Sequence, residues 1–270
     1  MAHVKEVTSL ANPMVKDIRA LTSKKDREAT GAFLAEGVGF VSDALARGWT
    51  VRTLVYDRTA KAEPHLRRVV DEALRQGGEV LEATEKVLSA ITRRDNPQAV
   101  IGVFQQRWTA LDALRLQPDA TLVALDRVRD PGNLGTIIRT ADAAGASGVV
   151  LIDECTDPFA LEAVRATMGS LLALPLTRCS ADEFLAWQAT AGARVVATHL
   201  DGAVDYRTID YRGKPTVLLM GTEQSGLQDR LADAADVRAR IPQQGSAESL
   251  NLAIATAVML FEARRHLLSL

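Results

Sequence analysis

The spacing of apolar residues predicts alternating strands and helices in the first part of the chain. Apolar runs of strand length are separated there by stretches whose apolar residues recur roughly every three or four positions, the period of an α-helix. This alternation is typical of a small α/β domain, which we place at residues 1–105. The predicted strands are 33–35, 51–56, 79–81 and 100–104, and the predicted helices are 38–47, 63–76 and 84–91.

After residue 119 the strand-length runs become apolar without interruption. Strands that are covered on both faces show this pattern, so it predicts a parallel sheet between two layers of helices over residues 120–270. The stretch 106–119, which contains Trp108 and Pro118, interrupts the rhythm and is the predicted linker. Parallel sheets bind ligands beyond the carboxyl ends of their strands, where functional residues are therefore expected. The predicted strands are 121–125, 148–152, 174–177, 193–198, 216–220 and 237–241.

The start of the chain predicts a short amphipathic helix that ends in basic residues. From Asn12 the apolar residues of 14–21 fall on one face, and Lys24, Lys25 and Arg27 continue the exposed side. Residues 1–110 hold 17 Lys and Arg against 14 Asp and Glu, whereas the rest of the chain holds 15 against 20. A polyanion is therefore expected at the first domain, although the net charge of −2 argues against attraction by bulk positive charge alone.

Composition narrows the class of protein. Hydrophobic residues make up 47% of the 270 residues and charged residues 24%, a balance typical of a globular protein. No apolar run has the length of a membrane span, and residues 1–16 lack the features of a signal peptide, so a cytoplasmic protein is expected. Cys155, Cys179 and the four scattered histidines show no ligand spacing, so neither a metal site nor a disulfide is predicted.

Three loops that follow predicted strands carry the candidate chemistry. The first runs from Asp126 to Gly135, contains DPGNLG at 130–135, and leads into a helix that carries Arg139. Its Pro-Gly turn and its last glycine allow a close approach to the backbone, and the helix start offers unpaired N–H groups. The second loop is GTEQSG at 221–226, and the third is IPQQGSAESLN at 241–251, which opens a helix predicted to end near Leu268. Taken singly, each loop also fits a plain turn before a helix.

Two details of these loops bear on their chemistry. The second loop has no Lys followed by Ser or Thr after its last glycine, which argues against binding of a nucleoside triphosphate. In the third loop Ser246 or Ser249 could cap the helix, whereas Asn251 stands within a strongly apolar stretch. An amide in such a place needs hydrogen-bond partners or a function, because an unsatisfied buried amide costs about 1–3 kcal/mol.

Together and in this order, the three loops resemble the signature motifs of the SpoU (TrmH-like) RNA 2′-O-ribose methyltransferases of the SPOUT superfamily. The resemblance covers residues 120–270. The first domain resembles the accessory RNA-binding domain of that family, which is similar to kink-turn-binding ribosomal proteins, through Asn12-Pro13, the basic cluster 24–27 and Glu36-Gly37. The resemblance also implies a homodimer and a deep trefoil knot in the second domain.

The resemblance implies S-adenosylmethionine as the cofactor and a set of site residues. Arginine is effectively always protonated, so Arg139 is expected to grip a substrate phosphate and stabilise the developing alkoxide, with Glu223 orienting it. A further family-like segment at 164–170 implies that Arg165 contacts RNA or the partner subunit. The implied catalytic residues are Asn133, Arg139, Glu223, Ser249 and Asn251. The residues implied around the cofactor are Leu200, Met220, Gly221, Gly226, Ile241, Pro242 and Leu250.

The implied substrate is structured RNA, and the ribosomal-protein-like first domain favours ribosomal RNA. A methyltransferase that acts on transfer RNA is the alternative among enzymes. A non-catalytic RNA-binding or assembly protein is the alternative outside enzymes, and the presence of all five polar catalytic positions argues against it. The sequence leaves the target base and nucleotide open.

Overall fold

The computed structural model describes residues 4–114, 116–222, 224–247 and 249–269. The chain forms two compact units, one from Met1–Gln106 with Asp157–Leu172 and the other from Arg107–Thr156 with Ala173–Leu270. Residues 157–172, which lie inside the predicted domain 120–270, therefore pack with the first unit. Among the described residues, no helix combines the length and the apolar character that crossing a bilayer demands.

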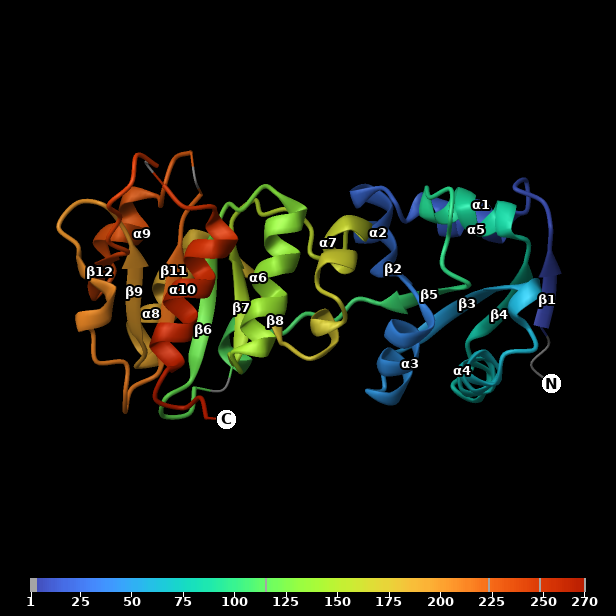
Figure 1. Cartoon of the computed structure of the whole chain (residues 1–270), viewed down its shortest axis with the longest axis horizontal. Coiled ribbons are helices and arrows are strands. Elements are labelled where there is room, and N and C mark those ends of the chain that lie inside the picture. The colour runs from blue at the N-terminus through green and yellow to red at the C-terminus, as the bar shows by residue number, and fades with distance from the viewer. Residues whose placement is uncertain (1–3, 115, 223, 248, 270) are drawn as a thin grey trace. The chain divides into compact units, whose positions relative to one another are not determined.

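The first unit contains a mixed β-sheet (Figure 1). Its strands are β1 (Val4–Val7), β2 (Ala32–Glu36), β3 (Val51–Asp57), β4 (Glu79–Ala83) and β5 (Val100–Gln105). Its helices are α1 (Pro13–Ala20), α2 (Lys24–Thr30), α3 (Val38–Ala46), α4 (Pro64–Arg75), α5 (Glu85–Thr92) and α7 (Leu161–Ala166). The order is β1-β4-β3-β5-β2, with β1, β4 and β3 parallel and β5 antiparallel to both of its neighbours. Every strand and helix predicted for residues 33–104 is present, which confirms the α/β class of this unit.

Two features of this unit lie outside the sequence-based predictions. β1 is an edge strand in which Val7 is buried and the other residues are exposed, so it lacks the apolar pattern of a covered strand. The helix expected after Asn12 is interrupted, because the backbone N–H groups of residues 21–23 bond to carbonyls three residues earlier. These tight turns end α1 and allow α2 to begin at Lys24.

Arg27 is buried, so the prediction of an exposed basic cluster at 24–27 is wrong at this residue. Arg27 is 3% exposed, whereas Lys24 and Lys25 lie on the surface. Its Nε donates to Asp157 Oδ2 at 2.7 Å, and its Nη1 donates to the carbonyl of Leu21 at 2.9 Å. The guanidinium therefore ties residues 157–172 to α2 and adds no charge to the surface.

Aromatic packing holds the same segment to the sheet of the first unit. The ring centroids of Phe33, on β2, and Phe159 are 4.9 Å apart. At the other end of the segment, Trp49 Nε1 donates to the carbonyl of Leu172 at 3.4 Å. All three side chains, Phe33, Trp49 and Phe159, are buried. Residues 157–172 thus complete the core of this unit.

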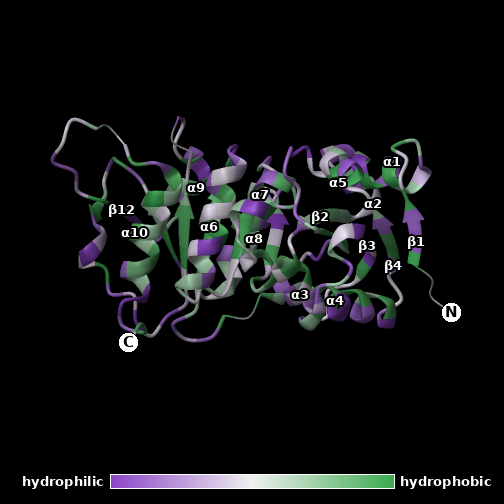
Figure 2. Ribbon diagram, turned by 45° about the vertical axis from the view of Figure 1, so that its right-hand side comes forward, coloured by the Kyte–Doolittle hydropathy of each residue, from purple (hydrophilic) through white to green (hydrophobic). Residues whose placement is uncertain are grey.

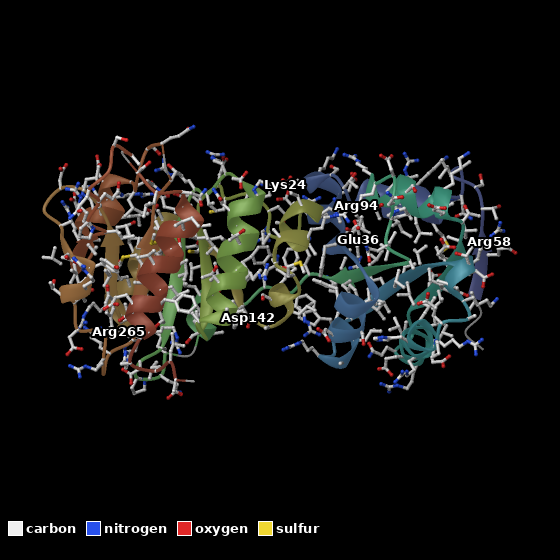
Figure 3. The ribbon with its side chains drawn as sticks, viewed as in Figure 1. Lys24, Glu36, Arg58, Arg94, Asp142 and Arg265 are labelled. Atoms are coloured by element: carbon white, nitrogen blue, oxygen red, sulfur yellow. The ribbon has the colours of Figure 1, made fainter. Side chains whose placement is uncertain are left out.

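Glu36 binds an arginine of this segment at the end of β2. Arg165, on α7, donates to Glu36 Oε1 from Nε at 3.1 Å and also from Nη2, which reaches the carbonyl of Thr92 at 2.8 Å. Arg94 Nε lies 3.8 Å from the second carboxylate oxygen of Glu36 (Figure 3). Arg165 therefore has a structural role within the first unit, and its predicted contact with RNA or a partner subunit stays a prediction.

The second unit contains a sheet whose strands are all parallel (Figure 1). The strands are β6 (Thr121–Asp126), β7 (Gly148–Ile152), β8 (Leu176–Cys179), β9 (Arg194–Thr198), β10 (Val204–Asp205), β11 (Thr216–Met220) and β12 (Val237–Arg240). The helices are α6 (Pro131–Ala143), α8 (Ala181–Ala191), α9 (Asp229–Asp233) and α10 (Leu252–Arg264). The order is β10-β12-β9-β11-β6-β7-β8. This confirms the predicted parallel sheet, while α10 ends at Arg264, short of Leu268.

Helices cover both faces of this sheet. α10 packs against α6, β6 and β11, and both helices lie in front of the sheet in Figure 1. On the other face Phe184 of α8 and Leu231 of α9 join a core cluster with Leu122 and Val217. Figure 2 shows mostly green, hydrophobic strands inside the unit and purple, hydrophilic stretches on the surrounding helices and loops. The uninterrupted apolar runs in the sequence therefore reflect strands buried on both faces.

The two cysteines are free thiols in half-buried positions of the second unit. Cys155 Sγ donates to the carbonyls of Leu125 and Ile152 at 3.4 and 3.3 Å. Burial raises the pKa of Cys155 to about 11 and that of Cys179 to about 12. Both thiols are therefore protonated at neutral pH and behave as small neutral side chains.

We predict that Arg27→Met lowers the free energy of unfolding of the first unit by about 3–5 kcal/mol, because it leaves the Asp157 carboxylate buried without its cation. The Arg27 and Asp157 side chains are 4% and 10% exposed. Urea unfolding followed by circular dichroism measures the loss, and faster hydrogen exchange in 157–172 locates it. Lys5→Met, which breaks a pair with side chains 56% and 52% exposed, is the control and should cost less than about 1 kcal/mol. Equal effects of the two substitutions would contradict the structural role of Arg27.

Candidate active site

Four strands of the second sheet end at one edge, where the loops that follow them meet. β6, β11, β9 and β12 are parallel neighbours, so their carboxyl ends point the same way. The loops after them begin at residues 127, 221, 199 and 241. Parallel sheets bind ligands at this edge, and the three predicted motif loops all lie here.

The first loop leads directly into α6, and Asp130 fixes the start of that helix. The Asp130 carboxylate accepts the backbone N–H of Asn133 at 2.6 Å. Pro131 occupies the first helical turn, where its missing N–H removes no helical hydrogen bond. Asn133 is thereby held in the first turn of α6 in a half-buried position.

The second loop closes on itself between its two glycines. Thr222 and Gly226 exchange backbone hydrogen bonds of 3.2 and 3.0 Å, and Thr222 Oγ1 lies 2.9 Å from Ser225 Oγ. A Cβ at Gly221 would come within 2.3 Å of the backbone of Gly226, whose own φ is 62°. Gly221 therefore leaves no room for a side chain, and Gly226 adopts a left-handed conformation that glycine favours. Glu223, a predicted catalytic residue of this loop, lies outside the described residues.

Asn251 connects the third loop to the first. Its side-chain oxygen caps α10 by accepting the backbone N–H groups of Ala253 and Ile254 at 2.9 and 3.3 Å. Its amide nitrogen donates to Asn133 Oδ1 at 2.9 Å, across 118 residues of sequence. Asn251 is exposed at the helix start and is not enclosed by the apolar residues that follow it. The cap of α10 is therefore this asparagine and neither of the two serines considered from the sequence.

A cavity of about 460 Å³ lies between the second and third loops. Its volume is typical of small-molecule sites, and its apolar side chains offer a surface for a flat ring beside the polar backbone of the second loop. The missing Cβ of Gly221 keeps that backbone compact. This lining fits the adenosine and the methionine parts of S-adenosylmethionine. It includes six of the seven residues predicted for the cofactor, which are Leu200, Met220, Gly221, Gly226, Ile241 and Leu250.

A larger cavity of about 670 Å³ adjoins the first, since Thr222, Gln224 and Ser225 line both. The hydrogen-bonded pair of Asn133 and Asn251 lines the larger cavity. Arg127, Arg129 and Asp130 also line it, although the motif comparison assigned them no role. The signal that could have found Arg127 and Arg129 is their place between the end of a buried strand and DPGNLG, the motif that Asp130 opens.

Other predicted residues are not gathered in the larger cavity. Ser249 lines the cofactor cavity. Arg139 and Pro242 are exposed and lie outside the lining of both cavities. The catalytic roles of these residues stay predictions. In the described part of the chain, no group of three or more His, Cys, Asp or Glu side chains is placed to hold a metal ion.

Two family models match this sequence. Residues 120–261 match the SpoU rRNA Methylase family. Residues 12–102 match the MRM3-like substrate binding domain. The first match contains all three motif loops, which line both cavities.

Similar proteins align with nearly the whole chain. It is 32% identical over 262 residues to the 23S rRNA (guanosine(2553)-2′-O)-methyltransferase RlmP of Bacillus subtilis, covering 97% of this chain and 100% of that protein. It is 33% identical over 254 residues to the 23S rRNA (uridine(2479)-2′-O)-methyltransferase of Streptomyces viridochromogenes, covering 92% and 88%. The AdoMet-bound rRNA methyltransferase from Sinorhizobium meliloti is 62% identical, covers 98% of this chain and 99% of that chain, and superposes with a TM-score of 0.94. The predicted resemblance and cofactor are thereby confirmed, and the chain belongs to the SpoU rRNA methylase family.

Proposed function

We propose that this protein transfers the methyl group of S-adenosylmethionine to a ribose 2′-hydroxyl of ribosomal RNA. The observation that carries the proposal is the hydrogen bond between Asn133 and Asn251, which line the cavity that adjoins the cofactor cavity. It joins the first and third motif loops at a place where a cofactor on one side and a nucleotide on the other can meet. Family membership and full-length relatives named as 23S rRNA 2′-O-methyltransferases support the same reaction.

The reaction requires a ribose oxygen aligned with a methyl carbon and its sulfur. S-adenosylmethionine, when bound, supplies an electrophilic methyl group on a sulfonium centre. Leu200, Met220 and Leu250 hold the adenosine by apolar contact in the smaller cavity. The pair of Asn133 and Asn251 holds the ribose in the larger cavity through side-chain amides whose orientation is fixed by their mutual bond. Prior alignment of this kind lowers the barrier, because it removes the entropy of bringing the reactants together.

A dimer formed through α10 accounts for the position of Arg139. Ile254 and Phe261 are 52% and 45% exposed, and with Val258 they follow the spacing of one helical face. We assign this apolar face to contact with a second copy of the chain. We further propose that Arg139, an exposed residue of α6, which packs beside α10, faces the second copy. There it grips a phosphate of the substrate and stabilises the developing alkoxide.

A deep trefoil knot in the second unit is part of the same proposal. β12 lies beyond β9 in the sheet, whereas α10 packs on β11, β6 and α6. The end of β12 and the start of α10 therefore lie at the carboxyl edge over different strands. We propose that the chain passes through a preceding loop there, as in other members of the family.

The first unit is the proposed anchor for ribosomal RNA. Its match to a substrate-binding domain covers residues 12–102. Lys24, Lys25, Arg93 and Arg94 are exposed on it, and Arg93 Nη2 donates to Thr22 Oγ1 at 2.8 Å, which brings the loop after α5 beside the start of α2. These side chains would contact phosphates, which bind cations without reading sequence. A ribosomal RNA substrate also supports the proposal that the protein is cytoplasmic.

We expect the purified protein to label ribosomal RNA, taken from cells that lack its gene, with radioactive methyl groups from S-adenosylmethionine. Methylation of the 2′-oxygen blocks its attack on the adjoining phosphodiester, so the label should survive alkaline hydrolysis in a dinucleotide. Transfer RNA from the same cells is the parallel substrate and should stay unlabelled. Label confined to transfer RNA, or released by alkali as a mononucleotide, would overturn the proposal.

We predict that Arg139→Ala lowers kcat by about 10²- to 10³-fold, the loss typical of removing one group that stabilises charge in the transition state. The affinity for S-adenosylmethionine should stay within about twofold, because Arg139 does not line the cofactor cavity. Single-turnover kinetics and calorimetry measure the two effects. Arg212→Ala, an exposed arginine of the same unit that pairs with Asp210, is the control and should leave both unchanged. Full turnover by Arg139→Ala would remove its catalytic role.

Asn251→Asp should separate the helix cap from the link to Asn133. Aspartate caps a helix about as well as asparagine, so thermal stability should change little, whereas Asn251→Ala should cost about 0.5–2 kcal/mol. The new carboxylate cannot donate to Asn133 Oδ1, so we expect kcat to fall by about tenfold or more in both variants, through misplacement of the ribose. Thermal unfolding and initial rates give the two readouts. An Asn251→Asp enzyme with the full rate would show that the link is dispensable.

A further inference from the structure

Arg127 lies in the larger cavity on a rigid support. It follows the last residue of β6, its φ is 53°, and its side chain is 31% exposed. Its Nε donates to Asp126 Oδ1 at 2.9 Å and its Nη2 donates to Asp126 Oδ2 at 3.1 Å. This two-point contact with a planar carboxylate fixes the plane of the guanidinium.

Asp126 is in turn held by Gln228, which follows the second loop. It is fully buried, and Gln228 donates to it twice at 2.9 Å, from its backbone N–H to Oδ2 and from its side-chain Nε2 to Oδ1. Gln228 stands 102 residues further along the chain, at the start of α9. Its Nε2 also lies 2.7 Å from Asp153 Oδ2, so the support extends to the end of β7. Four hydrogen bonds to one buried carboxylate therefore hold Arg127 in place.

The N–H groups of Arg127 that do not bond to Asp126 can donate to a ligand in the cavity. A guanidinium has five N–H donors, and the bonds to Asp126 use one on Nε and one on Nη2. The hydrogen bond with Asp126 also raises the pKa of Arg127, so it keeps its charge at every physiological pH. The cavity thus contains a permanent cation that cannot swing away without breaking its contact with a buried carboxylate.

The charge of this cavity suits an anion. Among its described lining residues, Arg127 and Arg129 stand with one carboxylate, Asp130, which already accepts the backbone N–H of Asn133. Arg129 lies 3.9 Å from Glu154, but both side chains are mostly exposed, so that pair is weak. Arg127 is absent from the lining of the cofactor cavity. The anion it meets therefore belongs to the substrate and not to the methionine carboxylate of the cofactor.

We propose that Arg127 is a positioning residue that binds the RNA phosphate next to the ribose to be methylated, and that Asp126 and Gln228 hold it in register with Asn133 and Asn251. The inference rests on the proposed function, because it takes the occupant of the larger cavity to be a nucleotide of RNA. It assigns a role to a residue outside the motif set. A phosphate fixed at this point sets the distance of the adjoining 2′-hydroxyl from the cofactor cavity.

The test compares Arg127→Ala and Arg127→Lys with the wild-type protein on ribosomal RNA. We expect both variants to raise KM for RNA by about 10- to 100-fold, because lysine keeps the charge but not the two-point geometry. Arg127→Ala should also reduce the slope of log K against log salt for RNA binding by about 1, whereas Arg127→Lys should keep it. The affinity for S-adenosylmethionine, measured by calorimetry, should stay within about twofold of wild type in both.

Arg212→Lys is the matched control. Arg212 contacts Asp210 through the same two nitrogens, at 2.8 and 3.1 Å, but outside both cavities, so its replacement should change none of these values. Lysine at 127 still offers a cation to Asp126, which keeps a folded variant available if the alanine variant unfolds.

A KM and a salt slope equal to those of the wild type in both Arg127 variants would overturn the inference, while the proposed methylation by the wild-type protein would stand. Weakened cofactor affinity with an unchanged KM for RNA would assign Arg127 to the cofactor carboxylate instead. A wild-type protein that methylates no RNA would remove the proposed function itself.

Discussion

The common direction of β6, β9, β11 and β12 is the constraint on which the site depends. Because these strands are parallel and adjacent, loops that are up to 118 residues apart in sequence emerge at one edge. Two polar contacts then fix the loops against one another. Asn251 bonds to Asn133 between the third and first loops, and Gln228, at the start of α9 just after the second loop, bonds to Asp126 at the end of β6. Both cavities are consequences of this arrangement, since each is lined by residues from at least two of the loops.

Much of this arrangement could be predicted from the sequence. Strands buried on both faces leave uninterrupted apolar runs, and those runs located the sheet of the second unit, although β8 begins two residues later than expected and the short edge strand β10 was missed. The two glycines of the second loop were also visible in the sequence, because the close turn leaves no room for a side chain at Gly221 and Gly226 adopts a left-handed conformation that glycine favours. Six of the seven residues predicted for the cofactor line one cavity, because they border the carboxyl ends of these same strands.

The remaining features depend on partners far away in the chain, which no local pattern reveals. The sequence pattern predicts an exposed Arg27, because its partner, Asp157, is 130 residues away. In the sequence Asn251 is an amide among apolar neighbours, and its contact to Asn133 is hidden because that residue is 118 positions away. The sequence assigned no role to Arg127 for a related reason. Its guanidinium is held by the buried carboxylate of Asp126, and the burial of a single aspartate at the end of a strand cannot be predicted from the sequence. Polar contacts between residues far apart in the sequence are thus what the structure adds to the hydrophobic pattern.

The discontinuity of the first unit has a consequence for protein synthesis. Phe159 and Asp157, which complete its core, are encoded after β6 and β7 of the second unit. While the chain emerges from the ribosome, Phe33 and Arg27 must therefore wait for residues 157–172, long after residues 1–106 have been made. Because synthesis proceeds from the N-terminus, part of the second unit is made before the first unit is complete. A protein that ended at residue 106 would lack residues 157–172 and therefore part of the core of the first unit.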